Sequence, residues 1–508
     1  MFFLKINLFT EKNNYYKGLL EMKSKKKSLK VNFIMNAILT MSSMIFPLIT
    51  FPYVSRVLLP VGTGKVAFAT SVVTYFSMFA QLGIPTYGIR ACAQVRDDKE
   101  KLSQTVQELL IINLIMMAFT YTFFFIGLQT VPRMQVDKPL FLIVSTMIFF
   151  NSIGMEWLYK GLEEYTYITV RSIAFKIVSL IAMFLLVKSQ GDYVIYGGVS
   201  IFASSASSVL NFINAHKYVS LRPMGTYDFR RHMRPVMIFF AMSCATTIYT
   251  NLDTVMLGFI KTDEDVGYYN AAVKIKGILV SVITSLGTVL LPRASYYIEH
   301  GLKRDFEQIS KKAINFVCVI ALPMMLYFIL YAKEGIYFLS GSAYDGSILP
   351  MQILMPTIFF IGLTNVMGIQ VMVPLGKENW VLYSVTIGAI VDLVINALLI
   401  PKMVSSGAAI GTLVAEIVVL IYQYWKLKDS MKGIFAEVRW MSLTLAMLLA
   451  GAGSACVKLF SFPTFIALVL SAGVYFGIYG SILLITGEPL VKEIVQQIIA
   501  KLASSKEK

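Results

Sequence analysis

Seven charged side chains interrupt the long apolar stretches of this sequence, and their types could support ion binding. A charge at the centre of a bilayer costs about 2.5–3.5 kcal/mol on insertion scales, so each is expected to face a partner or a water-filled cavity. Basic side chains at that depth suit an anionic ligand, whereas acidic ones suit a cation or a proton. The seven residues are Arg56, Lys176, Asp253, Lys274, Lys276, Asp392 and Glu416.

Two of these lysines are neighbours on one predicted helix, near the middle of the stretch 251–293. Residues two apart on an α-helix point roughly 200° apart, so Lys274 and Lys276 cannot both line one cavity squarely. Steps of three and four from Lys274 reach polar or small residues, including Asn270 and Ser281, whereas the same steps from Lys276 reach apolar ones. We therefore expect Lys274 to be the cavity cation and Lys276 to pack against a neighbouring helix or to snorkel.

The remaining charges are assigned by position. Arg56 and Asp253 fall near the outer ends of two equivalent helices, so we predict that they pair and close the outer mouth of a cavity. Lys176 and Asp392 lie mid-span at nearly equivalent positions, and both are predicted to face the interior. The acids assigned to gating or ion coupling are Asp253, Asp392 and Glu416, and the cations assigned to substrate binding are Lys274, Arg56 and Lys176.

Polar residues also form a stripe on each of the first two predicted spans, at about 31–58 and 65–88. Their steps of three and four place them on one side of an otherwise apolar helix. Such a stripe indicates a face turned towards a cavity or another helix. The predicted cavity-lining residues on these spans are Asn36, Thr40, Ser43, Thr70, Thr74, Ser77 and Gln81, and Asn270 and Ser281 join them from the second half of the chain.

The elements that must carry these residues are membrane-spanning helices. Of the 508 residues, 56% are hydrophobic and 15% are charged, and the mean hydropathy is +0.68, which exceeds what a soluble globular protein carries. Apolar stretches of about 20 residues, each long enough to cross about 30 Å of hydrocarbon, recur from residue 31 almost to the end. Fourteen such stretches predict an all-α polytopic membrane protein with 14 transmembrane helices.

The pattern of the first half starts again in the second. GKVAFATSVVTYFSMFAQLG at 64–83 aligns with GYYNAAVKIKGILVSVITSLG at 267–287, at an offset of 203 to 204 residues. We expect two pseudo-symmetric six-helix lobes with a substrate site between them, and two extra helices. The predicted parts are a cytoplasmic N-terminal segment at 1–30, lobes at 31–215 and 236–427, a cytoplasmic loop at 216–235, accessory helices at 428–487 and a cytoplasmic amphipathic tail at 488–508. Residues 1–21 are interpreted as an upstream extension of the true start, with an interfacial helix as the alternative.

The net charge of +16 could suggest a nucleic-acid partner, but the basic residues are spread through loops rather than gathered on one stripe. If both termini are cytoplasmic, 33 of the 45 lysines and arginines fall in cytoplasmic segments, nine in outer segments and three within spans. This is the bias that the positive-inside rule describes, and the opposite orientation would invert it. We therefore predict a cell-membrane protein with both termini in the cytoplasm and no nucleic-acid partner.

Sequence motifs of familiar catalytic sites are missing. The chain shows no Gly-rich phosphate loop, metal-ligand spacing or nucleophile elbow, and its three histidines fall in predicted cytoplasmic loops. We predict that it is not an enzyme and has no metal or cofactor. An inside-negative potential favours outward movement of a doubly charged anion by about 4.6 kcal/mol per 100 mV. Transport could therefore be driven by the membrane potential, and the acidic residues leave coupling to H⁺ or Na⁺ open.

Several segments resemble one known family. They include FPYVSRVLLPVGTGKVAFATSVVTYFSMFAQLGIPTYGIR at 51–90, EWLYKGLEEYTYITVRSIAFKI at 156–177 and NALLIPKMVSSGAAIGTLVAE at 396–416. With NLDTVMLG and GYYNAAVKI, these motifs resemble the Wzx-type oligosaccharide flippases of bacterial O-antigen and capsule assembly, which belong to the multidrug/oligosaccharidyl-lipid/polysaccharide exporter superfamily. The similarity covers about 22–487. One departure is Leu59, where the family usually has glycine.

The resemblance implies a two-lobed, inverted-V fold that works by alternating access. It implies that the cargo is an undecaprenyl-diphosphate-linked oligosaccharide, and that membrane lipids and other polysaccharide-assembly proteins are partners. A multidrug exporter, or an exporter of another lipid-linked precursor, with the same fold is the alternative. A multispan glycan polymerase or acyltransferase is less favoured, because the sequence has neither a long basic outer loop nor an intramembrane histidine.

Overall fold

The computed structural model describes residues 29–223, 225–428, 433–493 and 496, and every regular element in these ranges is helical. Twelve of the described helical stretches are long and apolar enough to span a membrane. Two of them, Ile34–Val95 and Glu378–Leu427, are long enough for two crossings each. Dividing these two stretches accommodates the fourteen predicted crossings, and the predicted all-α membrane fold is confirmed.

The helices Leu29–Gln81 and Glu378–Leu427 of these stretches are each broken by one residue with a positive φ. Leu59 has φ 57° and ψ −179°, and Val404 has φ 55° and ψ −129°. Leu59 also precedes Pro60, and a residue before proline is disfavoured in the helical region. Glycine alone adopts the Leu59 conformation without strain. The departure noted in the sequence at Leu59 therefore coincides with the sharp turn between the first two crossings.

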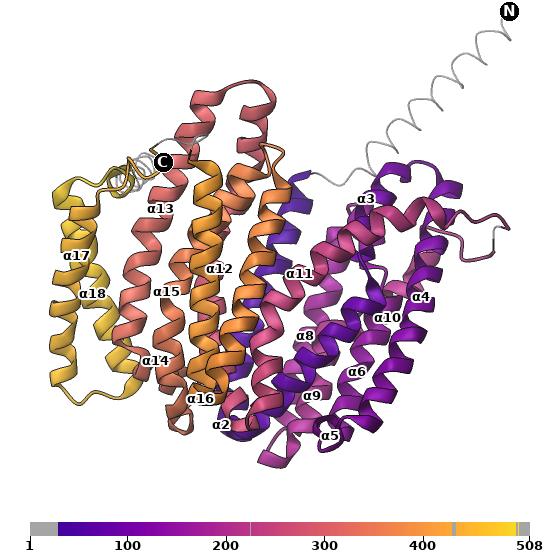
Figure 1. Ribbon diagram of the computed structural model, residues 1–508, viewed down its shortest axis with the longest axis horizontal. Coiled ribbons are helices and arrows are strands. Elements are labelled where there is room, and N and C mark those ends of the chain that lie inside the picture. Colours follow the sequence, from indigo (N-terminus) through magenta and orange to yellow (C-terminus); the bar gives the residue numbers. More distant parts are fainter. Residues whose placement is uncertain (1–28, 224, 429–432, 494–495, 497–508) are drawn as a thin grey trace, which may run out of the picture.

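The first lobe forms one group of helices in Figure 1 and contains the first six crossings. Its first helix supplies two of them, on either side of Leu59. The bounds are α2 Leu29–Gln81, α3 Ile84–Val95, α4 Lys99–Thr130, α5 Pro132–Gln135, α6 Lys138–Ile153, α7 Glu156–Gly161, α8 Tyr165–Leu186, η1 Gln190–Asp192, α9 Tyr193–Ile201, η2 Phe202–Ala206, α10 Ser208–Asn214 and η3 Ala215–Lys217.

The second lobe forms the other group, with two further helices at its far edge (Figure 1). Its longest helix supplies two crossings, on either side of Val404. The bounds are α11 Arg230–Ile260, α12 Asp263–Glu299, α13 Lys303–Leu330, α14 Ala332–Leu339, η4 Ser342–Ser347, α15 Ile348–Asn365, η5 Val366–Met372, α16 Glu378–Leu427, α17 Trp440–Ala455, η6 Cys456–Leu459 and α18 Thr464–Thr486. The predicted loop 216–235 ends earlier than expected, because α11 already begins at Arg230.

The accessory helices α17 and α18 are fixed to the second lobe by buried tyrosine hydroxyls. Tyr327 on α13 donates to the backbone oxygen of Leu468 at 2.9 Å, and Tyr479 on α18 donates to that of Val319 at 2.8 Å. A buried hydroxyl is costly unless it is paired, so these bonds help to hold the helix pair in place. Of the predicted tail at 488–508, residues 494, 495 and 497–508 lie outside the described residues.

The two ends of the bundle differ in charge. The end that carries α3 and the start of α11 is at the top of Figure 1, α7 packs against α3, and we call this end the basic face. The opposite end carries α5, α14 and the turns at Leu59 and Val404, and we call it the turn face. Residues that make the basic face positive include Arg90, Arg96, Arg230, Arg231 and Lys303.

The two lobes approach each other most closely at the turn face, through two glycines. A Cβ atom at Gly64 would lie 1.7 Å from the backbone oxygen of Asp263, and one at Gly267 would lie 2.1 Å from that of Pro60. Both pairs of equivalent positions are separated by the repeat offset, since 267 − 64 and 263 − 60 both equal 203. The repeat is thus seen in the structure as a reciprocal backbone contact between α2 and α12.

Candidate functional site

Arg56 joins the two lobes at the turn face, but it does so without Asp253. Its guanidinium donates to the backbone oxygen of Phe338 at 2.7 Å and to those of the residues on either side. These oxygens lie at the C-terminal end of α14, where the helix dipole also favours a cation. Asp253 has other partners, described below. The predicted Arg56–Asp253 pair is therefore not formed in this structure.

Further contacts join the lobes at the same face. Arg133 on α5 forms an ion pair with Asp263 at the start of α12, and it also donates to the backbone oxygen of Gly258 at 2.8 Å. The hydroxyls of Thr63 and Tyr344 lie 2.8 Å apart in a buried contact. We call these contacts, with those of Arg56 and of the two glycines, the turn-face seal. Among the described parts of the chain, the hydrogen bonds and ion pairs between α2–η3 and α12–α18 all belong to this face.

A cavity of about 440 Å³ lies inside the second lobe, among α11, α12, α15 with η5, and α16. Asp253 is one of its walls and is only 7% exposed. Its carboxylate accepts hydrogen bonds from Tyr269 Oη at 2.5 Å, from Asn396 Nδ2 at 2.6 Å and from Thr412 Oγ1 at 2.8 Å. Three donors satisfy much of the charge of this buried group. The other charged residues that line the cavity are Lys276 and Glu416.

Asp392 is a buried carboxylate of a different kind. It is 2% exposed, and neither of its carboxyl oxygens has a hydrogen-bond partner among the described residues. It lies one helical turn before Asn396, and a Cβ atom at Gly411 would come within 2.2 Å of Asn396 Oδ1 and 2.9 Å of Asp392 Oδ1. Close packing of the two halves of α16 thus holds Asp392 beside the partners of Asp253. A buried carboxylate without donors is costly unless a proton or a cation neutralises it.

The two neighbouring lysines point in different directions, but the structure corrects part of their assignment. Lys276, which we expected to pack against a helix or to snorkel, lines the second-lobe cavity with Asp253 and Glu416. Lys274 is exposed, does not line that cavity, and has no hydrogen-bond or ion-pair partner among the described residues. The periodicity of the sequence could not separate a cavity inside one lobe from a cleft between two lobes.

The direction of Lys274 follows from the neighbours of its helix. On one side α12 packs against α13, α15 and α16 of its own lobe, and on the other it packs against α2 of the first lobe. Lys276 points into the second lobe, so Lys274, about 200° away, points to the side of α2. Nearby on α12, Asn270 and Ser281 are half-buried, and Ser281 donates to the backbone oxygen of Gly277 at 2.8 Å.

Lys176 is held within the first lobe. Its ammonium donates to Ser42 Oγ at 2.9 Å and to Ser43 Oγ at 2.8 Å, which joins α8 to the first half of α2. It does not contact Asp392, which lies in the second lobe. Of the residues near the basic face, Glu156 forms ion pairs with Lys160 and Arg171, at 2.8 Å and 3.5 Å.

The polar stripes of α2 differ in burial between its two halves. The residues of the first half are exposed, and those of the second half are buried or half-buried. Ser77 Oγ accepts hydrogen bonds from Gln81 Nε2 at 2.9 Å and from Asn151 Nδ2 at 3.3 Å. The exposed residues are Asn36, Thr40 and Ser43; the half-buried residues are Thr70, Thr74 and Gln81; and Ser77 is buried.

A cluster that the sequence did not reveal ties the start of α11 to the first lobe at the basic face. Glu108 on α4 is fully buried and accepts hydrogen bonds from Arg231 Nη2 at 2.5 Å, from His232 Nε2 at 2.7 Å and from the backbone N–H of Asp228 at 2.7 Å. The Tyr87 hydroxyl lies 2.8 Å from His232 Nδ1. Because the other end of α11 carries Asp253 in the second lobe, this helix connects both lobes.

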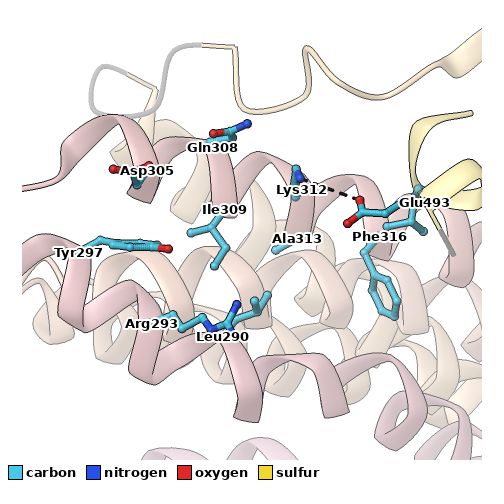
Figure 2. Close-up of a pocket in the computed structure, with 11 residues that line it drawn as sticks. Leu290, Arg293, Tyr297, Asp305, Gln308, Ile309, Lys312, Ala313, Phe316 and Glu493 are labelled. Carbon is cyan, nitrogen blue, oxygen red and sulfur yellow. Dashed lines mark ion pairs between the residues drawn. The ribbon is translucent and has the colours of Figure 1, made fainter. Parts of the chain in front are cut away.

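A second cavity, of about 370 Å³, lies at the basic face of the second lobe (Figure 2). Arg293 and Tyr297 reach it from α12, and Lys312 reaches it from α13. Lys312 and Glu493 face each other at 4.0 Å, and both are more than half exposed, so this ion pair contributes little stability. None of the residues predicted from the sequence to bind substrate or ions lines this cavity.

Comparison with known proteins identifies the family. A family model described as "Polysaccharide biosynthesis protein" matches residues 29–298, which is more than half of the chain. The chain belongs to this family. A second model, MatE, matches residues 239–398, from α11 into α16. The family resemblance found in the sequence is therefore confirmed.

Two bacterial proteins named as candidate O-antigen transporters are similar to this member of the polysaccharide biosynthesis protein family. The protein from Escherichia coli K12 is 25% identical over 353 residues, which cover 69% of this chain and 85% of that protein. The protein from Shigella dysenteriae is 25% identical over 403 residues, which cover 78% of this chain and 98% of that protein.

Two solved structures share the fold. The lipid II flippase MurJ, in an inward closed conformation, matches with a TM-score of 0.72 at 14% identity, covering 91% of this chain and 100% of that one. An inward-facing multidrug resistance MATE family transporter matches with a TM-score of 0.60 at 14% identity, covering 79% and 99%. The expected two-lobed fold is therefore confirmed. The two relatives and the two structural neighbours are named as transporters or flippases, not as enzymes.

Proposed function

We propose that this protein is a flippase that moves an undecaprenyl-diphosphate-linked oligosaccharide across the bacterial cell membrane during the synthesis of a polysaccharide such as O-antigen or capsule. Family membership and the similarity to candidate O-antigen transporters support a lipid-linked glycan as the cargo. The fold shared with a lipid II flippase supports translocation by alternating access. Membrane lipids and other polysaccharide-assembly proteins are the partners that this function implies.

Two features together support the proposal: the turn-face seal closes one end of the space between the lobes, at α2 and α12, and Lys274 points to that space without a described partner. A diphosphate that leaves water needs a compensating cation, and Lys274 supplies one. Because the turn face is sealed in this conformation, the cargo enters from the basic face.

The direction of transport follows from the charge of the two faces. The positive-inside rule places the basic face in the cytoplasm, so the turn face is the outer one and both termini are cytoplasmic. The cargo enters from the cytoplasm and leaves after the turn-face seal opens. Export of a doubly charged headgroup in this direction is favoured by the membrane potential.

The second-lobe cavity gives the transporter a means of coupling to a cation. Asp253 and Glu416 are buried carboxyl groups of its wall, and buried Asp392, which lies beside the partners of Asp253, has no donor among the described residues to stabilise its charge. A proton or Na⁺ suits such an oxygen-rich site. Because α11 carries Asp253 at one end and contacts the first lobe at the other, a cation at this site acts on the helix that connects the lobes.

The proposal is tested by measuring how strongly the purified protein binds the cargo, with native mass spectrometry as the binding assay. Lys274→Ala should bind the undecaprenyl-diphosphate-linked oligosaccharide at least tenfold more weakly than wild type, because removal of one partner of a desolvated charge pair costs about 2–5 kcal/mol. Lys261→Ala, at the turn-face end of α11, is the matched control and should bind as wild type does. Equal binding by Lys274→Ala and wild type, or equal binding of undecaprenol without the diphosphate, would contradict the proposal.

A further inference from the structure

The position of Lys276 has a consequence for the cation site. Lys276 lines the second-lobe cavity together with Asp253 and Glu416, and Asp392 lies nearby, outside the lining. It forms no hydrogen bond or ion pair of its own with another described residue, and its side chain is half-buried. An ammonium on a flexible four-carbon stem thus stands beside two carboxyl groups of the cavity wall and near a third, Asp392, without a fixed partner.

The carboxyl groups differ in how well other residues compensate their charge. Asp253 already accepts three hydrogen bonds, whereas the oxygens of Asp392 accept none from the described residues. Asp392 is 2% exposed, so water cannot compensate for its charge. Positive charge near Asp392 is therefore favoured, and either a cation in the adjoining cavity or Lys276 can supply it.

We propose that Lys276 is a tethered competitor of the coupling cation, whose ammonium neutralises the carboxyl groups of the second-lobe cavity when the cation is absent and gives way when the cation binds. This inference rests on the cation coupling proposed above. It assigns to Lys276 the role of setting the affinity of the site. A site that held three carboxyl groups without an internal cation would keep its ion too tightly to release it in each transport cycle.

The titratable groups that line the cavity with Lys276 are Asp253 and Tyr249 on α11, Tyr269 on α12 and Glu416 on α16. Asp392 on α16 adjoins the cavity, and Tyr75 on α2 approaches Asp253 and Asp392 from the first lobe. The side chains that α15 and η5 contribute, such as Thr364 and Asn365, do not titrate. The balance at the site is therefore one fixed cation against three carboxyl groups, and removal of the lysine changes that balance by one full charge.

The test measures equilibrium binding of ²²Na⁺ to the purified full-length protein, in wild type and in Lys276→Met. The neutral side chain has a similar length, and the variant should bind Na⁺ at least tenfold more tightly. Lys276→Gln, a second neutral variant, should behave in the same way, whereas Lys276→Arg keeps the charge and should stay close to wild type. The matched control is Lys261→Met, just after α11, whose Na⁺ binding should equal that of wild type because its side chain lies outside the cavity.

A parallel experiment tests the proton as the coupling ion. If wild-type transport depends on pH and not on Na⁺, the proton concentration that gives half-maximal transport should fall at least tenfold in Lys276→Met. If wild type responds to neither ion, the coupling proposal and this inference are both wrong. If wild type responds to one of them and the neutral variants keep the wild-type affinity, the inference about Lys276 is wrong and cation coupling stands.

Discussion

An alanine at Gly267 should weaken the turn-face seal, and the structure gives the size of the effect. The added Cβ atom would lie 2.1 Å from the backbone oxygen of Pro60, whereas ordinary contact begins at 3.4 Å. The two helices must therefore separate by roughly 1 Å, because a backbone carbonyl cannot rotate away as a side chain would. Overpacking of this kind costs about 1–3 kcal/mol. The cost applies only to the sealed conformation, so the equilibrium should move about 5- to 150-fold towards the unsealed one.

The shift can be measured as a distance between the lobes. Cysteines at Gln135 and Lys333, which are exposed at the turn face of the first and second lobes, carry spin labels in a protein whose native cysteines have been replaced. Double electron–electron resonance should show a population at longer distance in Gly267→Ala that is minor in the parent protein. Gly64→Ala should do the same, and the double variant should add little, since one separation relieves both clashes.

The matched control lies on the same helix. A Cβ atom at Gly277 would meet nothing within 4 Å, so Gly277→Ala should leave the distance distribution unchanged. Both substitutions raise the helix propensity by the same amount, so helix propensity cannot explain a difference between their distance distributions. Identical distance distributions for Gly267→Ala and Gly277→Ala would refute the reasoning.

Three further predictions concern particular side chains. Arg133→Asp and Asp263→Arg should each reduce transport, and the double exchange should restore part of it because the ion pair is re-formed with reversed polarity; transport assays check this. Leu59→Gly should raise the melting temperature of the detergent-purified protein, since relief of the strain of about 1–3 kcal/mol at φ 57° outweighs the lost contacts of a half-buried side chain. Glu108→Gln should lower the melting temperature by an amount that corresponds to about 3 kcal/mol, because the buried carboxylate holds Arg231 at the start of α11.

The two predictions of stability each have a control variant, and the charge exchange has a clear contradicting outcome. Val61→Gly, at an exposed helical position near the same turn, should lower the melting temperature, in contrast to Leu59→Gly. Glu100→Gln, at an exposed position on the same helix as Glu108, should leave it within experimental error. A double exchange of Arg133 and Asp263 that is as inactive as either single variant would show that charge complementarity does not matter there.

The all-helical architecture could be predicted from the sequence because the physics of spanning a membrane is local. Each crossing needs about 20 apolar residues, and that requirement is visible without any tertiary contact. The repeat was also visible, and Gly64 and Gly267 occupy equivalent positions in it. That these two glycines touch each other could not be foreseen, because the offset gives equivalence and not proximity.

The candidate site was less predictable, for a physical reason. Intramembrane charges mark sites reliably, but which charges meet depends on the rotation and tilt of each helix, which packing decides. Asp253 was singled out as a gate, yet its donors come from α12 and from both halves of α16. Asn396 carried one signal that could have been used, since it lies one turn from Asp392 on the same helix face. Glu108 gave no comparable signal, because its partners Arg231 and His232 lie more than 100 residues away.

The central claim is that this chain flips a lipid-linked oligosaccharide, and reconstitution tests it most directly. Purified protein is placed in liposomes that contain an undecaprenyl-diphosphate-linked oligosaccharide, and the fraction of sugar that reaches an impermeant glycosidase outside is followed with time. Wild type and Gly277→Ala should expose the inner-leaflet sugar at least tenfold faster than protein-free liposomes, and Lys274→Ala should not exceed the protein-free rate. A wild-type rate equal to that of protein-free liposomes would contradict the account.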